Sequence, residues 1–179
     1  MKIDTIVNQP VIETERLMLR PLRRSDAGLM ELYGSDERVA RMTRTIPHPL
    51  PPGATEAFVA RALSDDRDED IWVLDGSANG IGEMLGVIAL ERMDREQSEI
   101  GYWVAPAFWN TGLASEAVRA LVEANPQGNR TMFASVFQDN PASARVLTNT
   151  GFEYLGDAEA FSVARGAAVP TWTYLKRYE

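Results

Sequence analysis

The sequence predicts one α/β (α+β) domain in which helices are interspersed with a mostly antiparallel sheet. Two observations lead to this prediction. The chain runs as one strand, then helices, a meander of strands, a helix, a strand, a helix and two closing strands, which is neither a repeated βαβ pattern nor all-β. Its 179 residues, 45% hydrophobic and 25% charged, suffice for one core. The sheet should become parallel only around the central strand–helix–strand unit.

The first half of the chain alternates one strand with short helices. Leu17 and Leu19 alternate with more polar neighbours, as in a strand, and Gly34 ends the first helix. Four prolines in one stretch exclude regular structure there. The expected elements are a strand at 16–22, helices at 27–34 and 37–42, a proline-rich loop at 45–53, a helix at 54–63 and a solvated turn at 65–70.

The second half carries most of the sheet. A Gly/Asn-rich segment between two apolar runs indicates a hairpin, and Gly151 is placed as a helix C-cap. The expected elements are strands at 71–76, 83–93 and 98–105, a helix at 116–124, a strand at 130–137, a helix at 142–150, and β segments at 152–163 and 169–178.

Composition excludes several kinds of site and partner. The net charge of −8 argues against nucleic acid as a partner, because nucleic-acid binding needs a clustered basic surface. The chain has no cysteine and one histidine, His48, so disulfides, cysteine nucleophiles and multi-histidine metal sites are excluded. No Gly-x-Ser-x-Gly elbow occurs. The first residues lack an apolar run, so we expect no signal peptide, no membrane contact and a cytoplasmic location.

A turn of small residues between Val104 and Val118 joins the strand at 98–105 to a helix. Gly112 and Ala114 carry almost no side chain, so a large group can approach the main chain closely. The first N–H groups of a helix have no internal partner, and the capping-box spacing is absent here. This arrangement suits a phosphate or pyrophosphate, although an ordinary tight loop looks the same in sequence.

Four segments in order resemble the GNAT superfamily of acetyl-CoA-dependent N-acetyltransferases. They are TERLMLRPL, EIGYWVAPAFWNTGLASEA, NPASARVLTNTGF and the strand-rich end, which together cover 13–178. The resemblance is strongest to the branch that contains the RimJ/RimL-type ribosomal-protein N-terminal acetyltransferases. It implies one GNAT domain over 1–179 with an N-terminal arm at 1–12. It also implies a sheet of about seven strands, flanked by about four helices and splayed at its central parallel pair.

The resemblance implies that acetyl-CoA is the co-substrate, with no metal, and that its pyrophosphate lies on the main-chain N–H groups of 110–115. In the family pattern Gln/Arg-x-x-Gly-x-Gly/Ala, Trp109 replaces the usual first residue. Asn110 replaces a frequent glycine, and Asn tolerates left-handed backbone best among the other residues. The residues implied to bind the co-substrate are Trp103, Val104, Ala105, Asn110, Thr111, Gly112, Leu113, Ala114, Ser115, Asn140 and Ser143.

The implied reaction is direct attack of an amine on the acetyl thioester. It needs an unprotonated amine, a stabilised oxyanion and a proton for the leaving thiolate. We expect the main-chain N–H of Val104 or Ala105 to meet the oxyanion, because Pro106 cannot donate and the ladder must break there.

Glu99 is the candidate catalytic base. Strand alternation places Glu99, Gly101 and Trp103 on one face of the strand, and a carboxylate and a glycine are poor choices for a core. Several enzymes of the resembled family use a glutamate at this strand position. The alternative is that Glu99 pairs with an arginine across the sheet.

The usual acid of the resembled family, a tyrosine, falls on Leu147 here. Tyr33, Tyr102 and Tyr154 are present, and the sequence does not distinguish among them. A thiol with a pKa near 8.5 could also regain its proton from the amine or from water.

The basicity of the amine is the only property that limits the choice of acceptor. Deprotonating an α-amine at pH 7 costs about 1.2 kcal/mol, against about 4.6 kcal/mol for a lysine, which favours an α-amine. A protein N-terminus, an amino acid, a polyamine and an aminoglycoside-like amine remain open. Two other functions also remain: a module that binds CoA without turnover, acting as a sensor or interaction domain, and a nucleotide-binding domain for ATP or NAD. The oligomeric state, monomer or homodimer, is not readable.

Overall fold

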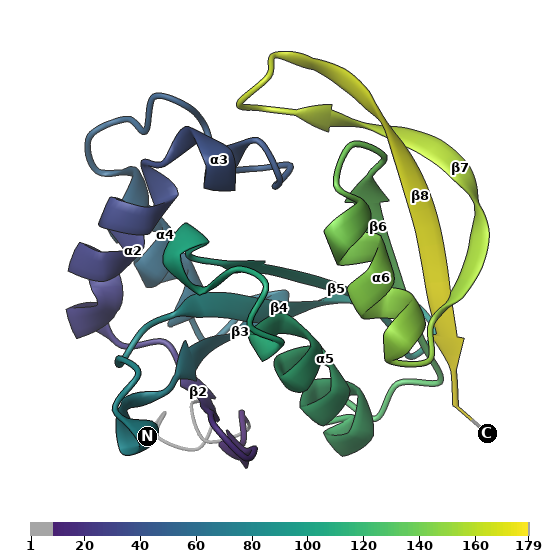
Figure 1. The fold of residues 1–179 in the computed structure, drawn as a ribbon, viewed down its shortest axis with the longest axis horizontal. Coiled ribbons are helices and arrows are strands. Elements are labelled where there is room, and N and C mark those ends of the chain that lie inside the picture. The colour runs from purple at the N-terminus through teal and green to yellow at the C-terminus, as the bar shows by residue number, and fades with distance from the viewer. Residues whose placement is uncertain (1–8, 179) are drawn as a thin grey trace.

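The computed structural model describes residues 9–178, which form an eight-stranded sheet in the order β1-β2-β3-β4-β5-β6-β8-β7 (Figure 1). Neighbouring strands are antiparallel except for β5 and β6. This confirms the predicted mixed sheet with one central parallel pair. The strands are β1 (Ile12–Glu13), β2 (Met18–Pro21), β3 (Glu69–Asp75), β4 (Gly86–Met93), β5 (Gln97–Val104), β6 (Thr131–Phe137), β7 (Glu153–Ser162) and β8 (Ala167–Arg177).

Helices cover both faces of the sheet. One core lies between the sheet and α5 and α6, and a second lies between the sheet and α2 and α4. Within residues 9–178 the helices are α2 (Ala27–Gly34), α3 (Glu37–Ala40), α4 (Ala54–Ala62), α5 (Leu113–Ala124) and α6 (Pro141–Asn149). No helix in this part of the chain is long and apolar enough to cross a bilayer.

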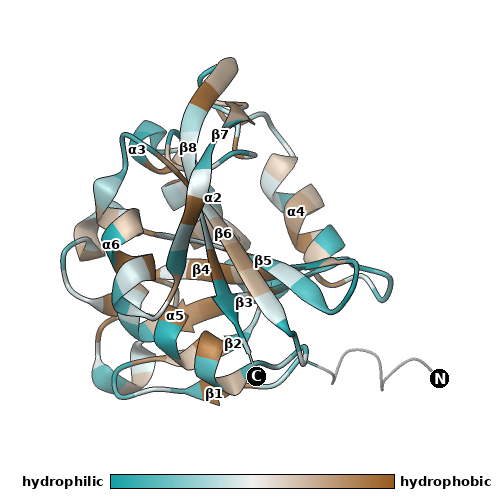
Figure 2. Cartoon of the chain, turned by 90° about the vertical axis from the view of Figure 1, so that its right-hand side faces the viewer, coloured by the Kyte–Doolittle hydropathy of each residue, from teal (hydrophilic) through white to brown (hydrophobic). Residues whose placement is uncertain are grey.

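The central strands are apolar because they are covered on both sides. In β4 the residues from Gly86 to Leu90 are all buried, and β3 is buried from Asp70 to its end. Figure 2 shows β4 as a nearly continuous hydrophobic band inside the fold. On β5 the residues alternate between the two cores: Ile100 and Val104 belong to the α5 side, whereas Trp103 packs on the α4 side. This is the alternation that the sequence predicts.

The sheet opens between β5 and β6, as predicted. The two strands pair only from Gln97 with Thr131 to Ile100 with Ala134. β5 then continues to Val104, while β6 continues along β8. Over its last four residues β5 therefore has a free edge toward β6 within the described part of the chain. This free edge positions the candidate site.

The hairpin of β7 and β8 reaches across the opening to the residues after α3 (Figure 1). The Val163 N–H donates to the Arg44 carbonyl over 3.0 Å. The Arg165 guanidinium donates to the Arg41 carbonyl over 2.8 Å and pairs with Asp139 over 2.6 Å. The segment at 41–44 is thus held from the far side of the sheet.

Two charged residues that look solvated in the sequence are buried. Asp70 is 2% exposed at the start of β3 and pairs with Arg67 at 2.9 Å and with Arg92 at 2.7 Å. The expected solvated turn at 65–70 is therefore wrong at its end, because two cations allow this carboxylate to enter the sheet. Arg20 is also buried in β2, between Asp26 and Asp75.

The N-terminal residues that the structure describes rest on the sheet. The Gln9 side chain donates to the Ile71 carbonyl over 2.6 Å, and the Trp72 indole donates to the Pro10 carbonyl over 2.8 Å. The end of the predicted arm forms β1, which adds a strand to the seven expected. Residues 1–8 of that arm lie outside the described residues.

Candidate functional site

Two cavities meet at the free end of β5. The first, called here the loop cavity, measures about 430 Å³ and lies between the end of β5, the loop that follows it and the first turns of α5 and α6. The second, the acidic cavity, measures about 760 Å³ and lies between α4, the loop after α3 and strands β3–β5. Met42, Tyr102 and Trp103 line both. A ligand in one cavity can therefore meet a ligand in the other beside β5.

The loop before α5 leaves main-chain donors free. Asn110 and Gly112 both adopt left-handed backbone, with φ of 61° and 81°, a conformation that Gly and Asn tolerate best. No side chain caps α5, and its first internal bond is from Glu116 N–H to the Gly112 carbonyl. Within residues 9–178 the N–H groups of 113–115 therefore have no partner, and the positive end of the helix faces the loop cavity.

A polar brace holds this loop from behind. Arg16 donates through Nε to Glu116 Oε1 over 2.7 Å and through Nη1 to the Thr111 carbonyl over 3.0 Å. Thr14 Oγ1 donates to the other Glu116 oxygen over 2.6 Å. Burial alone would raise the pKa of Glu116, but the hydrogen bonds from Thr14 and Arg16 outweigh burial and lower it. No local sequence pattern reveals this brace, because Thr14 and Arg16 lie about a hundred positions from Thr111 and Glu116.

The end of β5 directs the Val104 N–H toward the opening. Alternate residues of a strand direct their main-chain groups to opposite edges. The Ala105 N–H donates to the Leu85 carbonyl over 2.8 Å, toward β4. Val104 therefore directs its groups toward the β6 side. There the Trp109 indole donates to the Val104 carbonyl over 2.6 Å, and the Val104 N–H faces the gap.

Ten of the eleven residues predicted to bind the co-substrate line the loop cavity. The exception is Ala105, which does not line this cavity: it is fully buried, its N–H donates to the Leu85 carbonyl and its carbonyl accepts from the Phe108 N–H over 2.9 Å. The ten are Trp103, Val104, Asn110, Thr111, Gly112, Leu113, Ala114, Ser115, Asn140 and Ser143.

The start of α6 closes the loop cavity opposite β5. The Asn140 side chain caps α6 by accepting from the Ser143 N–H and donates to Ser143 Oγ over 3.1 Å. Leu147, which occupies the tyrosine position of the resembled family, is fully buried in the core. Of the three tyrosines left open, Tyr102 lies at the junction of the cavities and donates to the Ser143 carbonyl over 3.1 Å. Burial raises the pKa of Tyr102, so its hydroxyl keeps its proton.

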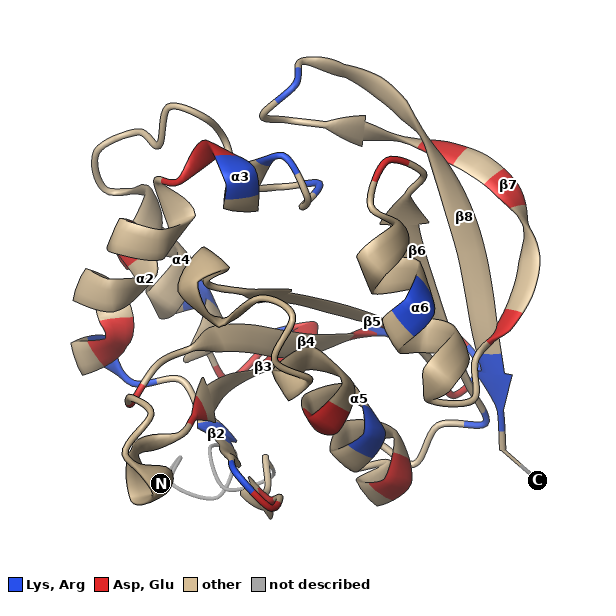
Figure 3. Ribbon diagram, viewed as in Figure 1, with Lys and Arg blue, Asp and Glu red and all other residues tan. Residues whose placement is uncertain are grey.

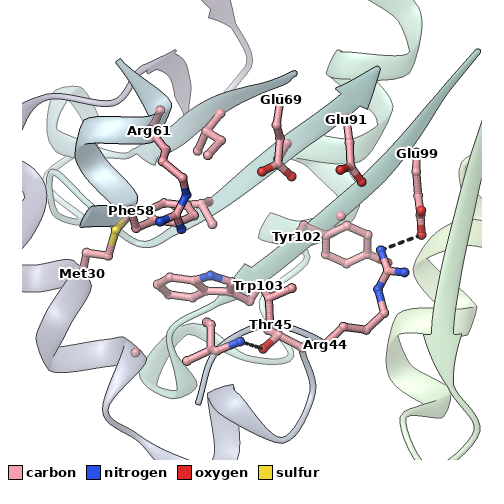
Figure 4. Close-up of a pocket in the computed structure, with 18 of the residues that line it drawn as sticks. Met30, Arg44, Thr45, Phe58, Arg61, Glu69, Glu91, Glu99, Tyr102 and Trp103 are labelled. Carbon is pink, nitrogen blue, oxygen red and sulfur yellow. Dashed lines mark hydrogen bonds and ion pairs between the residues drawn. The ribbon is translucent and has the colours of Figure 1, made fainter. Parts of the chain in front are cut away.

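Three glutamates form a row along one side of the acidic cavity (Figure 4). Glu69 on β3 lies opposite Glu91 on β4, and Glu91 lies opposite Glu99 on β5. Burial and the charge of Glu91 raise the pKa of Glu69. Like charges directly opposite in a sheet are destabilising, so this row is costly to the fold. Of these three glutamates, only Glu99 is predicted from the sequence to belong to the site.

Glu99 forms an ion pair, as the alternative interpretation allowed, but not across the sheet. Its partner is Arg44, from the loop after α3, at 3.0 Å. Gly101 has no atom within 4 Å of the place that a Cβ would occupy, so the floor of the cavity between Glu99 and Trp103 stays open.

His48 does not line either cavity. No group of three or more His, Cys, Asp or Glu side chains in residues 9–178 could hold a metal ion.

Comparison with known proteins agrees with this geometry. The family model of the acetyltransferase (GNAT) domain matches residues 16–153. The uncharacterised N-acetyltransferase YoaA of Bacillus subtilis is 26% identical over 170 residues, covering 92% of this chain and 95% of the relative. The ribosomal-protein-serine acetyltransferase of Escherichia coli is 32% identical over 89 residues, covering 42% of this chain and 50% of its own.

Solved structures share the whole fold. Mycobacterium smegmatis RimJ, in complex with a CoA-disulfide, superposes with a TM-score of 0.79 at 18% identity, covering 94% of this chain and 88% of that chain. At this identity the likeness shows that the fold is shared.

Proposed function

This chain belongs to the GNAT acetyltransferase family, and on that premise we propose that it moves an acetyl group from acetyl-CoA directly to a primary amine held in the acidic cavity. It is an acetyltransferase with acetyl-CoA as co-substrate, as its N-acetyltransferase relatives and its CoA-bound structural neighbours support. The proposal that the acceptor is an amine rests on one observation: an acidic cavity meets the free edge of β5.

The loop cavity suits the donor. Acetyl-CoA, when bound, supplies an acetyl thioester and a pyrophosphate. The free N–H groups of 113–115, at the positive end of α5, suit the pyrophosphate. Gly112 leaves room for it, since a Cβ there would meet only the Arg16 guanidinium, at 3.3 Å. The Val104 N–H suits the oxygen that gains charge during transfer.

The acidic cavity suits an amine that arrives protonated. Glu99 accepts the proton that the ammonium group must lose before it can attack. The proposed proton path therefore starts at Glu99, on the acidic side of β5. Tyr102, at the junction, stays neutral, and its hydroxyl is held by the Ser143 carbonyl near the place where the two substrates meet.

A protein N-terminal α-amine is the first candidate acceptor. Its low pKa makes it the easier amine to deprotonate, and one relative is named a ribosomal-protein-serine acetyltransferase. A small amine with several positive charges is the second candidate. The row of Glu69, Glu91 and Glu99 favours it, because three carboxylates can contact more than one ammonium group.

Thiol release from acetyl-CoA tests the proposal. The acceptors compared are six-residue peptides with a free N-terminal serine or alanine, the same peptides already N-acetylated, free amino acids, 1,4-diaminobutane and an aminoglycoside. We expect acceptor-dependent release with at least one free amine and none with the blocked peptides. Tight CoA binding without release by any amine would instead identify a module that binds CoA without turnover.

A further inference from the structure

The carboxylate proposed to receive the acceptor already holds a cation of the chain itself. Arg44 Nη2 lies 3.0 Å from Glu99 Oε2, inside the acidic cavity (Figure 4). The Arg44 side chain comes from the loop after α3, within a basic segment that Figure 3 shows around α3. An ammonium group cannot make the same contact with Glu99 while the guanidinium stays there.

We propose that the Arg44 guanidinium occupies the position on Glu99 to which the acceptor binds. Only an acceptor that is itself positively charged can then replace the guanidinium. The proposal rests on the proposed function. The exchange conserves charge at Glu99, because one cation leaves as another arrives. A protonated alkylamine meets this requirement, whereas an arylamine, which is neutral at pH 7, does not. Arg44 thereby selects the chemical class of acceptor.

The contacts of Arg44 make such an exchange easy. Its side chain is 45% exposed and that of Glu99 is 21% exposed, and ion pairs open to water are weak. The Arg44 carbonyl is held by the Val163 N–H over 3.0 Å, so the main chain stays fixed while the side chain rotates into solvent. The acceptor therefore displaces one flexible side chain and needs no movement of the loop.

Other cations that line the acidic cavity are engaged elsewhere. Arg67 pairs with the buried Asp70 at 2.9 Å. Arg61 lies over the Phe58 ring, 5.8 Å from its centroid. Among residues 9–178, Arg44 is the cation paired with Glu99. Arg61 consequently provides a matched control with the same charge in the same cavity.

The test compares Arg44→Gln, Arg44→Lys and Arg61→Gln with the wild type, using steady-state kinetics with 1,4-diaminobutane and the free-serine peptide. Because an exposed ion pair is weak, we expect Arg44→Gln to lower the acceptor KM about two- to fivefold with little change in kcat. Arg44→Lys keeps a competing cation and should stay near the wild-type KM. Arg61→Gln should lower KM less than Arg44→Gln does.

Three results would overturn the inference: an unchanged KM in Arg44→Gln, a raised KM, or an equal fall in Arg61→Gln, which would indicate general charge repulsion. Titration calorimetry of 1,4-diaminobutane into each protein without acetyl-CoA gives a readout independent of turnover, with the same order of Kd values expected. If the wild type acetylates no amine, the proposed function fails. This titration still decides whether Arg44 competes with the amine for Glu99. Thermal unfolding confirms that each variant is folded.

Discussion

The two cavities beside β5 are built in different ways. Most of the loop cavity is lined by the end of β5, the loop that follows it and the start of α5, where N–H groups are left free. The acidic cavity is formed by side chains from separate segments, with Glu69, Glu91 and Glu99 brought together only by strand pairing. The difference indicates that the donor side depends on backbone conformation, whereas the acceptor side depends on individual charges. Substitutions on the two sides should therefore impair different properties of the protein.

The largest expected effect is on the acidic side, at the candidate base. Glu99→Gln keeps the shape of the side chain and removes its ability to take a proton. We expect kcat/KM for the amine to fall about 10²- to 10⁴-fold, since positioned proton transfer contributes about that much. Acetyl-CoA affinity should be unchanged, because Glu99 lies on the other side of β5. Steady-state kinetics and calorimetry with acetyl-CoA measure the two quantities.

Glu91→Gln is the matched control for that prediction. Glu91 lies directly opposite Glu99 and undergoes the same change of charge, but it sits one strand further from the opening. We expect a much smaller loss of kcat/KM. Equal losses in the two variants would mean that the row acts only as a diffuse negative field, and the role of Glu99 as base would be abandoned.

The next effect is on the loop side and acts through the backbone. Gly112 has φ of 81°, a conformation that costs a residue with a side chain about 1–2 kcal/mol. Gly112→Val should therefore disturb the loop and weaken acetyl-CoA binding about 5- to 30-fold, a factor that corresponds to that cost. Calorimetric titration with acetyl-CoA measures it.

Gly128→Val is the control for backbone strain alone. Gly128 also has positive φ, 65°, with no atom near a would-be Cβ, and it lies in the turn before β6. It should lose comparable stability in thermal unfolding and keep its affinity for acetyl-CoA. A loss of affinity as large as that of Gly112→Val would show that the loop has no special role.

A smaller effect is expected at Trp109. Trp109→Phe keeps a ring but removes the N–H that donates to the Val104 carbonyl. One hydrogen bond contributes about 1 kcal/mol, so the KM for acetyl-CoA should rise about two- to tenfold. Trp72→Phe loses a similar indole bond, to Pro10; Trp72 lines neither cavity, so this change should lower only the stability. Identical KM values in wild type and Trp109→Phe would remove Trp109 from the site.

The smallest effect is a gain in stability. Burial and the Glu91 charge raise the pKa of Glu69 above its ordinary 4.5, so its ionised form disfavours the folded state at neutral pH. Glu69→Gln should raise the free energy of unfolding by about 0.2–1 kcal/mol at pH 7. The gain should vanish as the pH falls below 4.5, where this carboxyl is protonated in both states.

Urea unfolding at pH 7 and near pH 3.5 measures this gain, with Glu159→Gln on the exposed strand β7 as control. A variant that is less stable than the wild type at pH 7 would mean that Glu69 is compensated in the fold. The row would then carry no stability cost.

Local sequence predicted the loop side better than the acidic side. The conformations of Asn110 and Gly112 and the uncapped start of α5 follow from residue types at consecutive positions. Sequence did not show that the Ala105 N–H faces Leu85 rather than the opening, because the edge to which a strand residue directs its hydrogen bonds depends on its pairing with the partner strand. Arg44 and Asp70 were missed or misread because their partners come from distant segments, whose approach no local pattern encodes.

The most direct test of the account is a crystal structure of this protein with CoA. We expect pyrophosphate density on the N–H groups of 113–115, and the thiol end beside the Val104 N–H at the opening between β5 and β6. Pyrophosphate density elsewhere, with these N–H groups left free, would contradict it.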